Sequence, residues 1–338
     1  MGIILKKCEH GGDPSLLEKL YGPPSDGWLD LSTGINPKPY KSKTIMTANW
    51  NSLPNTKDLK KLQQIAASNY GVKDPNFVTV APGTQAIIQW LPRMRGKSRV
   101  LVASPTYNEH AYCWKMAGHI VEEIDNFEKS QKKADVIIIV NPNNPDGRQI
   151  TPNYLKKLAQ KQAKHDGWLI VDEAFCDVAP SISLASEAGI AGLIILRSFG
   201  KFYGLAGLRL GFALSNYKTT EQLSKLMGPW AVSSPALEIG KEALNDKNWT
   251  LSTLNELKIS SERLDKVLIS NGLNIIGGTS LFRLASSDHT DLMFDFLAKQ
   301  GIMTRRFHYQ SKWLRFGLPG LSKDWDRLEL ALKRFNSQ

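Results

Sequence analysis

The chain has 338 residues, of which 42% are hydrophobic and 22% are charged. These fractions are close to the averages for globular proteins, and they argue against disorder and fibrous structure. The 43 lysines and arginines exceed the 32 acidic residues and give a net charge of +11, which favours acidic partners such as small phosphorylated substrates. The basic residues are scattered and are not interleaved with aromatic residues, which argues against a single-strand nucleic-acid surface.

The apolar runs are too short to span a bilayer, and the N-terminus lacks the apolar core of a signal peptide. The three cysteines, Cys8, Cys113 and Cys176, are far apart, which argues against a disulfide framework and a cysteine zinc site. His110 and Cys113 could share a helix face, which we interpret as packing. We therefore expect a cytoplasmic protein without a metal site.

From residue 56 onward, helical and buried-strand patterns alternate. Apolar spacing and end signals predict helices over residues 56–71, 84–94, 108–119 and 151–167, and strands within residues 76–83, 99–105, 134–142, 168–175 and 192–199. This alternation is typical of a mostly parallel sheet flanked by helices. After Pro229 the pattern changes to long helices, followed by a mixed segment of strands and helices from residue 273 onward.

These patterns predict an α/β protein in three parts. Residues 1–35 form an N-terminal segment that contributes to the active site or to the small domain. Residues 36–230 form a large domain built on the parallel sheet, and residues 231–338 form a linking helix and a smaller C-terminal α+β domain. Ligands of open α/β sheets bind at the carboxyl ends of the strands, so polar residues at those ends are site candidates.

Several polar residues occupy such positions. Gly83, Thr84 and Gln85 follow a strand and open a helix, where backbone amides can bind a phosphate, although such a stretch can equally be an ordinary turn. Asn144 lies in a turn after a buried strand. Asp172 ends another buried strand, where an unpaired carboxylate would be costly, so we expect it to have a cationic partner.

The segment "RSFGKFYGLAGLRLGF", residues 197–212, places Lys201 among several glycines and follows it with Arg209. A solvated lysine needs no glycine neighbours. A lysine that must meet a bulky ligand needs a backbone that turns tightly and approaches closely. The segment therefore predicts a ligand site at Lys201.

The order and spacing of these residues resemble the fold-type I pyridoxal-5′-phosphate (PLP) enzymes, the class I/II aminotransferase superfamily. The resemblance covers nearly the whole chain and rests on Gly83-Thr84, Tyr107, Asn144, Asp172, Ser198-x-x-Lys201 and Arg209. It implies that PLP is the cofactor and that the protein is a homodimer.

The resemblance also implies roles for individual residues. Lys201 forms the Schiff base with the cofactor aldehyde and moves protons. Asp172 pairs with the pyridine nitrogen and keeps it protonated, which makes the ring an electron sink. Asn144 donates to the phenolic oxygen and Tyr107 stacks on the ring. The cofactor phosphate is held by the side chains of Thr84, Ser198 and Arg209 and by backbone groups at Gly83 and Gln85.

One branch of the superfamily resembles this chain more closely. The stretches "HGGD" (10–13), "WLDLSTGINP" (28–37) and "NPNNPDGR" (141–148) are similar to the threonine-phosphate decarboxylases of cobalamin biosynthesis. That branch is related to the histidinol-phosphate aminotransferases. The resemblance implies decarboxylation of L-threonine O-3-phosphate to (R)-1-amino-2-propanol O-2-phosphate. We expect the substrate to be anchored by His10, Asn36, Arg305 and Arg315, with Arg306 as an alternative to Arg305.

Two positions depart from the wider pattern. Phe175 stands where many aminotransferases have a tyrosine, so one hydrogen bond to the phenolic oxygen is absent. Leu53 stands where relatives have a tyrosine that reaches the cofactor phosphate of the neighbouring subunit. Three alternatives stay open: an aminotransferase acting on histidinol phosphate, a basic nucleic-acid-binding protein, and a protein that keeps the fold without activity.

Overall fold

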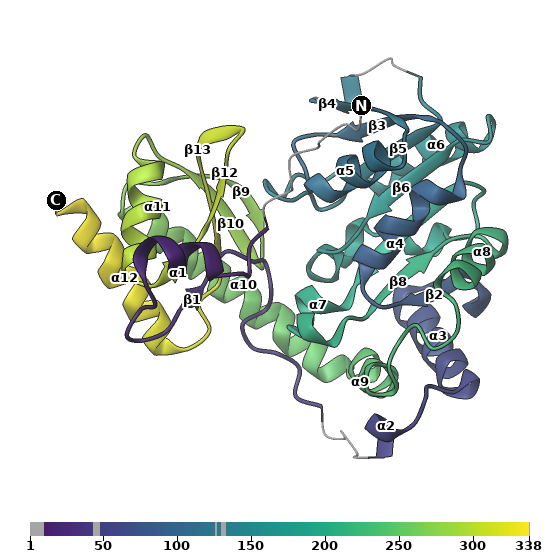
Figure 1. The fold of residues 1–338 in the computed structure, drawn as a ribbon, viewed down its shortest axis with the longest axis horizontal. Helices are drawn as coiled ribbons and strands as arrows, with labels where there is room; N and C mark the ends of the chain where they lie inside the picture. The colour runs from purple at the N-terminus through teal and green to yellow at the C-terminus, as the bar shows by residue number, and fades with distance from the viewer. Residues whose placement is uncertain (1–9, 43–47, 126, 130–132, 338) are drawn as a thin grey trace. The chain divides into compact units, whose positions relative to one another are not determined.

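The computed structural model describes residues 10–42, 48–125, 127–129 and 133–337 (Figure 1). Within these ranges the chain divides into two compact units. The larger contains residues 40–144 and 148–249, and the smaller contains residues 10–39, 145–147 and 250–337. Residues 1–9 of the predicted N-terminal segment, including Cys8, lie outside the described residues. The predicted division at residues 35 and 230 stays a prediction.

The larger unit is built on a seven-stranded sheet with the order β2-β8-β7-β6-β5-β3-β4. Strands β7, β6, β5, β3 and β4 run parallel, whereas β8 is antiparallel to both β2 and β7. The strands are β2 (Val78–Ala81), β3 (Arg99–Ala103), β4 (Ile120–Ile124), β5 (Val136–Val140), β6 (Trp168–Asp172), β7 (Leu193–Ser198) and β8 (Gly211–Leu214). The five predicted strands are confirmed, and β4 and β8 were not predicted.

Helices of the larger unit lie on the faces of this sheet, whereas α2 lies away from it (Figure 1). The helices of this unit are α2 (Ala48–Asn51), α3 (Thr56–Tyr70), α4 (Thr84–Trp90), α5 (Asn108–Met116), α6 (Pro152–Ala163), α7 (Phe199–Phe202), α8 (Tyr217–Met227) and α9 (Ser234–Asn245). The start of α6 follows from its sequence, because the Thr151 side chain accepts a hydrogen bond from the amide of Tyr154 and Pro152 occupies the first turn. All five residues of β5 are buried, as its continuous apolar run predicts.

The smaller unit contains a four-stranded antiparallel sheet, β12-β13-β10-β9, and a parallel pair, β1-β11. Its strands are β1 (Leu29–Asp30), β9 (Asn274–Thr279), β10 (Phe282–Ser286), β11 (Ile302–Met303), β12 (Arg305–Phe307) and β13 (Gln310–Gly317). Its helices are α1 (Ser15–Tyr21), α11 (Thr290–Lys299) and α12 (Ser322–Asn336), and α10 (Lys247–Ser270) begins in the larger unit. Among the described residues, no helix is long and apolar enough to cross a membrane.

Candidate active site

Strand pairing in the larger unit brings the predicted phosphate ligands together. Gly211 of β8 pairs with Ala81 at the end of β2 on one side and with Ser198 at the end of β7 on the other. A Cβ atom on Gly211 would lie 2.6 Å from the amide nitrogen of Thr84. The absence of a side chain at Gly211 therefore allows Thr84, in the first turn of α4, to lie close to β8, and Ser198 of β7 is paired with the same glycine.

Arg209 reaches this point from a left-handed backbone conformation with φ of +53°. Its Nη1 donates to the carbonyl of Ala206 at 3.0 Å, and a Cβ atom on Gly83 would lie 2.8 Å from its Nη2. The amide of Gly83 already donates to the carbonyl of Ala81 at 2.7 Å. The contribution of Gly83 is therefore the room that its missing side chain leaves for the guanidinium of Arg209. A guanidinium beside a hydroxyl and first-turn amides is a donor set suited to a phosphate.

Asp172 lies at the carboxyl end of β6 and is buried. Its Oδ2 is 2.8 Å from Nε2 of His110, and its Oδ1 accepts a hydrogen bond from the amide of Ala174 at 2.9 Å. His110 is therefore a partner of the predicted pyridine-nitrogen ligand, and its expected role in packing alone was wrong. The available signal was its position three residues after Tyr107, the N-cap residue of α5.

Tyr107 connects this carboxylate to the phosphate end of the site. Its hydroxyl donates to Oε1 of Gln85 at 3.2 Å, and Nε2 of Gln85 donates to Glu109 at 2.7 Å. The rings of Tyr107 and His110 are nearly perpendicular, with centroids 6.0 Å apart. The first turn of α4 and the first turn of α5 are thereby fixed to each other and to β6.

Asn144 lies in the loop after β5, the strand next to β6 in the sheet. The side chain of its neighbour Asn143 donates to the carbonyl of Pro105 at 2.9 Å and accepts from the hydroxyl of Thr106 at 2.6 Å. Thr106 directly precedes Tyr107. The loop that carries Asn144 is therefore held against the segment that carries the predicted ring-stacking tyrosine.

Lys201 lies on α7, and its Nζ is 5.6 Å from the centre of the Phe175 ring. Phe175, three residues after Asp172, thus faces the lysine with an apolar ring that has no hydrogen-bonding group. The Tyr203 ring stacks on Phe199 and on Trp249, with centroid distances of 4.2 and 5.4 Å. This aromatic packing anchors the short helix that carries Lys201.

The predicted substrate residues all lie in the smaller unit. Arg305 of β12 and Arg315 of β13 are directly paired in the antiparallel sheet. Burial, followed by the nearby charge of Arg305, lowers the pKa of Arg315 to about 10. Two guanidinium groups at such a position favour the binding of an anion, because an opposite charge relieves their repulsion.

Arg306 belongs to the opposite face of β12, since side chains alternate along a strand. Its guanidinium lies 4.6 Å from the centre of the Phe294 ring on α11. Arg305 therefore shares a face with Arg315, whereas Arg306 packs against a helix. This distinguishes the two arginines, which the sequence left as alternatives.

The segment that follows His10 lies beside Arg315. The amide of Gly12 donates to Oγ of Ser32 at 2.8 Å, and the carbonyl of Ser32 accepts from Nη2 of Arg315 at 2.7 Å. Asn36 is buried, and its Oδ1 accepts from the amide of Lys38 at 2.9 Å. The structure therefore joins the "HGG" segment to Arg315 through Ser32, and it places Asn36 in a local turn.

Leu53, which stands where relatives have a tyrosine, lies in the larger unit and is 67% exposed.

The family model described as "Aminotransferase class I and II" matches residues 28–328, and the chain belongs to this family. The threonine-phosphate decarboxylase of Pseudomonas aeruginosa is 42% identical, over 97% of this chain and 98% of that protein. The threonine-phosphate decarboxylase of Sinorhizobium sp is 39% identical, over 96% of this chain and 97% of that protein.

Among solved structures, the L-threonine-O-3-phosphate decarboxylase from Porphyromonas gingivalis is similar in fold. The TM-score is 0.77 at 20% identity, and the match covers 91% of this chain and 98% of that one. The predicted fold class, a fold-type I α/β protein with a smaller second part, is confirmed.

Proposed function

We propose that this chain is a PLP-dependent lyase that converts L-threonine O-3-phosphate into (R)-1-amino-2-propanol O-2-phosphate in cobalamin biosynthesis. The observation that carries the proposal is the 42% identity to a threonine-phosphate decarboxylase over nearly the full length of both chains. The larger unit supports it independently, because a buried carboxylate, a lysine and a phosphate-type donor set converge at the carboxyl ends of its strands.

The residues of the larger unit fit PLP. Arg209 lies against Gly83, where a side chain would collide with the guanidinium, so room for the cofactor phosphate is kept. Asp172 is a buried carboxylate, as a ligand to a protonated ring nitrogen must be, and Lys201 faces an apolar ring. When bound, the cofactor supplies the electron sink that takes up the electrons released on loss of CO2.

The chain's own residues carry the other parts of the reaction. Lys201 would hold the cofactor through its side-chain amine, and the same amine, when free, would deliver a proton to Cα of the substrate. Asp172, oriented by His110 at 2.8 Å, holds the proton on the ring nitrogen. Asn144 donates to the phenolic oxygen and Tyr107 covers the ring.

Thr84, Gln85, Ser198 and Arg209 bind the cofactor phosphate in this proposal, and Gly83 provides the space for it. The substrate's carboxylate and phosphate are bound by His10, Asn36, Arg305 and Arg315. How these residues hold the two anions would determine which group on Cα, the carboxylate or the hydrogen, is placed to leave.

The Gly83→Ala variant tests the phosphate site. We expect PLP to bind roughly 10- to 100-fold more weakly, because displacing Arg209 loses a charge-assisted hydrogen bond. The matched control is Gly228→Ala, where φ is also positive, at +73°, but no heavy atom lies within 4 Å of the added Cβ. Both variants lose stability through backbone strain. Equal PLP affinities in the two variants, measured by fluorescence titration, would contradict the assignment.

The Arg315→Ala variant tests the substrate site. We expect KM for L-threonine O-3-phosphate to rise roughly 10- to 100-fold, as for loss of a hydrogen bond to a charged group, while PLP affinity stays unchanged. The control is Arg306→Ala, which removes the arginine that packs on Phe294. Steady-state kinetics and PLP titration on both variants provide the comparison. Parallel loss of substrate and cofactor binding in Arg315→Ala would make the residue structural.

The second candidate function is an aminotransferase acting on histidinol phosphate, which membership of the aminotransferase family favours. The deciding experiment incubates the PLP-loaded protein with L-threonine O-3-phosphate, without a keto acid, and follows CO2 and the visible spectrum. Release of CO2 with repeated turnover supports the decarboxylase. Turnover only with histidinol phosphate and 2-oxoglutarate would replace it by the aminotransferase.

We further propose that the protein acts as a cytoplasmic homodimer. Three large apolar side chains of the larger unit, Trp50, Leu53 and Trp230, are between 61% and 67% exposed. The hydroxyl of Ser234 donates to the carbonyl of Ser52 at 2.9 Å and ties two of these segments together. Clustered exposed apolar residues are typical of protein interfaces. A monomeric mass by light scattering at micromolar concentration would refute the dimer.

A further inference from the structure

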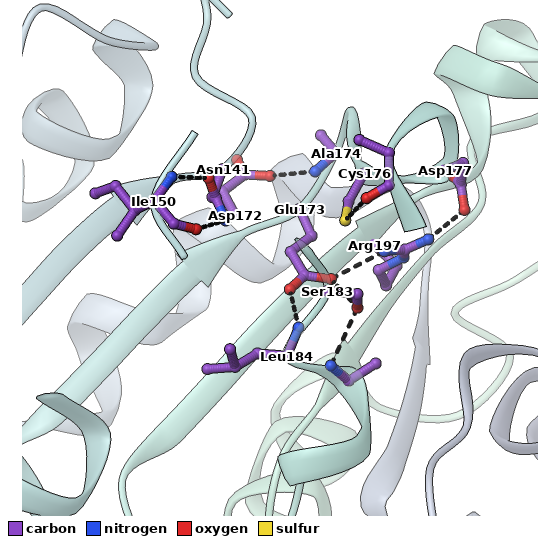
Figure 2. Close-up of polar contacts among 12 residues, drawn as sticks. Asn141, Ile150, Asp172, Glu173, Ala174, Cys176, Asp177, Ser183, Leu184 and Arg197 are labelled. Carbon is purple, nitrogen blue, oxygen red and sulfur yellow. Dashed lines mark hydrogen bonds and ion pairs between the residues drawn. The ribbon is translucent and has the colours of Figure 1, made fainter. Parts of the chain in front are cut away.

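Directly after Asp172, the chain enters a buried group of charged side chains that the proposed mechanism does not use. Figure 2 shows Glu173 and Asp177 on either side of the guanidinium of Arg197. The side chain of Glu173 is fully buried, and that of Arg197 is 4% exposed. Nη1 of Arg197 donates to Oε2 of Glu173 at 2.9 Å, and Nη2 donates to Oδ1 of Asp177.

Glu173 uses both of its carboxylate oxygens. Oε2 also accepts from the hydroxyl of Ser183 at 2.6 Å, and Oε1 accepts from the amide of Leu184 at 2.6 Å. The guanidinium of Arg197 lies 4.5 Å from the centre of the Tyr70 ring. Both members of the ion pair are therefore held in one geometry by several neighbours (Figure 2).

The ion pair joins the two strand ends that carry Asp172 and Ser198, both proposed to bind PLP. Glu173 directly follows Asp172 at the end of β6, and Arg197 directly precedes Ser198 at the end of β7. The strands are parallel neighbours, and the amide of Glu173 donates to the carbonyl of Leu196 at 2.9 Å. A shift of either side chain would therefore move one strand end relative to the other.

The guanidinium of Arg197 also holds the turn that carries Phe175. It binds Glu173 on one side of Phe175 and Asp177 on the other, so both ends of the turn are attached to β7. Phe175 in turn lies against Nζ of Lys201. The contact between the turn and the lysine thus depends on Arg197.

Stability is a weak explanation for this arrangement. A buried ion pair costs desolvation, and apolar replacement of both partners is often neutral or stabilising, whereas removal of one partner is strongly destabilising. A buried ion pair with fixed geometry instead holds the ends of β6 and β7 in defined positions.

We propose that Glu173 and Arg197 are positioning residues whose ion pair sets the placement of Asp172 relative to Ser198 and Lys201. This inference rests on the PLP-binding role of those three residues in the proposed function. The pair touches neither substrate nor cofactor in this proposal and acts only through its sequence neighbours.

The test compares Arg197→Met with Arg197→Lys and Glu173→Gln. Lysine keeps the positive charge and can still reach one carboxylate. Glutamine keeps an acceptor for the amide of Leu184, but it places an NH2 donor where Oε2 of Glu173 accepts from Ser183 and Arg197. The matched control is Arg283→Met in the smaller unit, which breaks an ion pair between Arg283 and Asp265 whose Nε–Oδ1 distance is 2.6 Å. Thermal unfolding of the apoproteins, PLP affinity, the pH dependence of the bound cofactor's visible absorption, kcat and KM are measured for each.

For Arg197→Met we expect kcat to fall by about 100-fold, as for a misplacement of about 1 Å, with KM little changed. PLP affinity should fall at least about tenfold, and the midpoint of the spectral pH titration should shift. Arg197→Lys should recover part of each loss. Glu173→Gln leaves Asp177 as the carboxylate partner of Arg197, and it should move the spectral midpoint along with a loss of stability.

The inference is overturned if Arg197→Met and Arg283→Met lose similar stability while the spectral midpoint, PLP affinity and kcat stay at wild-type values in both. Arg197→Lys and Glu173→Gln provide the same comparison if Arg197→Met does not fold. A failure of the proposed reaction can be distinguished from a failure of the positioning role, because PLP affinity and the spectral titration are measured without substrate. A wild-type protein that binds PLP but releases no CO2 from L-threonine O-3-phosphate refutes the proposed reaction and leaves the positioning test intact.

Discussion

Replacing Lys201 with alanine is expected to abolish turnover while PLP still binds noncovalently. The variant loses both the covalent attachment and the amine that moves the proton at Cα, and a positioned acid–base group alone contributes roughly 10²- to 10⁴-fold. We therefore expect kcat to fall by at least about 10⁴-fold. The Thr84, Ser198 and Arg209 side chains remain, so the phosphate of the cofactor keeps its ligands.

Two measurements check this prediction. Release of CO2 from L-threonine O-3-phosphate reports turnover, and borohydride reduction followed by mass spectrometry reports whether PLP is attached to the peptide that contains Lys201. The control is Lys225→Ala, which removes an exposed lysine of α8 whose ion pair with Glu221 lies at the surface. Ordinary turnover in Lys201→Ala, or PLP attached to another lysine in the wild-type protein, would refute the assigned role.

Asp172→Asn is expected to lower kcat by at least about 100-fold, the scale for losing one preorganised electrostatic group. Asparagine keeps the shape of aspartate and can still accept from the amide of Ala174, but it has no charge to hold the proton on the ring nitrogen. Because the hydrogen-bonded framework is retained, we expect the unfolding temperature to change little and the loss to appear in kcat.

The comparison for Asp172→Asn is Asp265→Asn, which neutralises a partly buried carboxylate paired with Arg283 outside the proposed site. Rapid mixing with substrate and the spectrum of the bound cofactor separate the chemical step from binding. Comparable kcat values for Asp172→Asn and the wild-type protein would show that the carboxylate does not support the reaction.

Much of the fold follows from local patterns in the sequence. The apolar run Val136–Val140 is a fully buried strand because a parallel strand with both faces covered needs apolar residues throughout. The first turn of α6 was predictable from Thr151 and Pro152. Strands β4 and β8 were not predictable in this way. β4 is a partly exposed edge strand, and β8 is a four-residue strand in a glycine-rich segment that is held by its pairing with β2 and β7.

The candidate site likewise contains residues that were found from the sequence and residues that only the tertiary structure revealed. The sequence alone determined the alternation of strands and helices in the larger unit, apart from β4 and β8, and the resemblance identified Lys201, Asp172 and Arg209, because motifs and apolar periodicity are properties of short stretches. Only the tertiary structure placed His110 at Asp172, Arg305 rather than Arg306 beside Arg315, and Arg197 between two carboxylates. Buried polar side chains form hydrogen bonds with residues far away in the chain, and His110 and Asp172 are 62 positions apart. The choice of partner depends on which strands and helices pack together, which no local pattern contains.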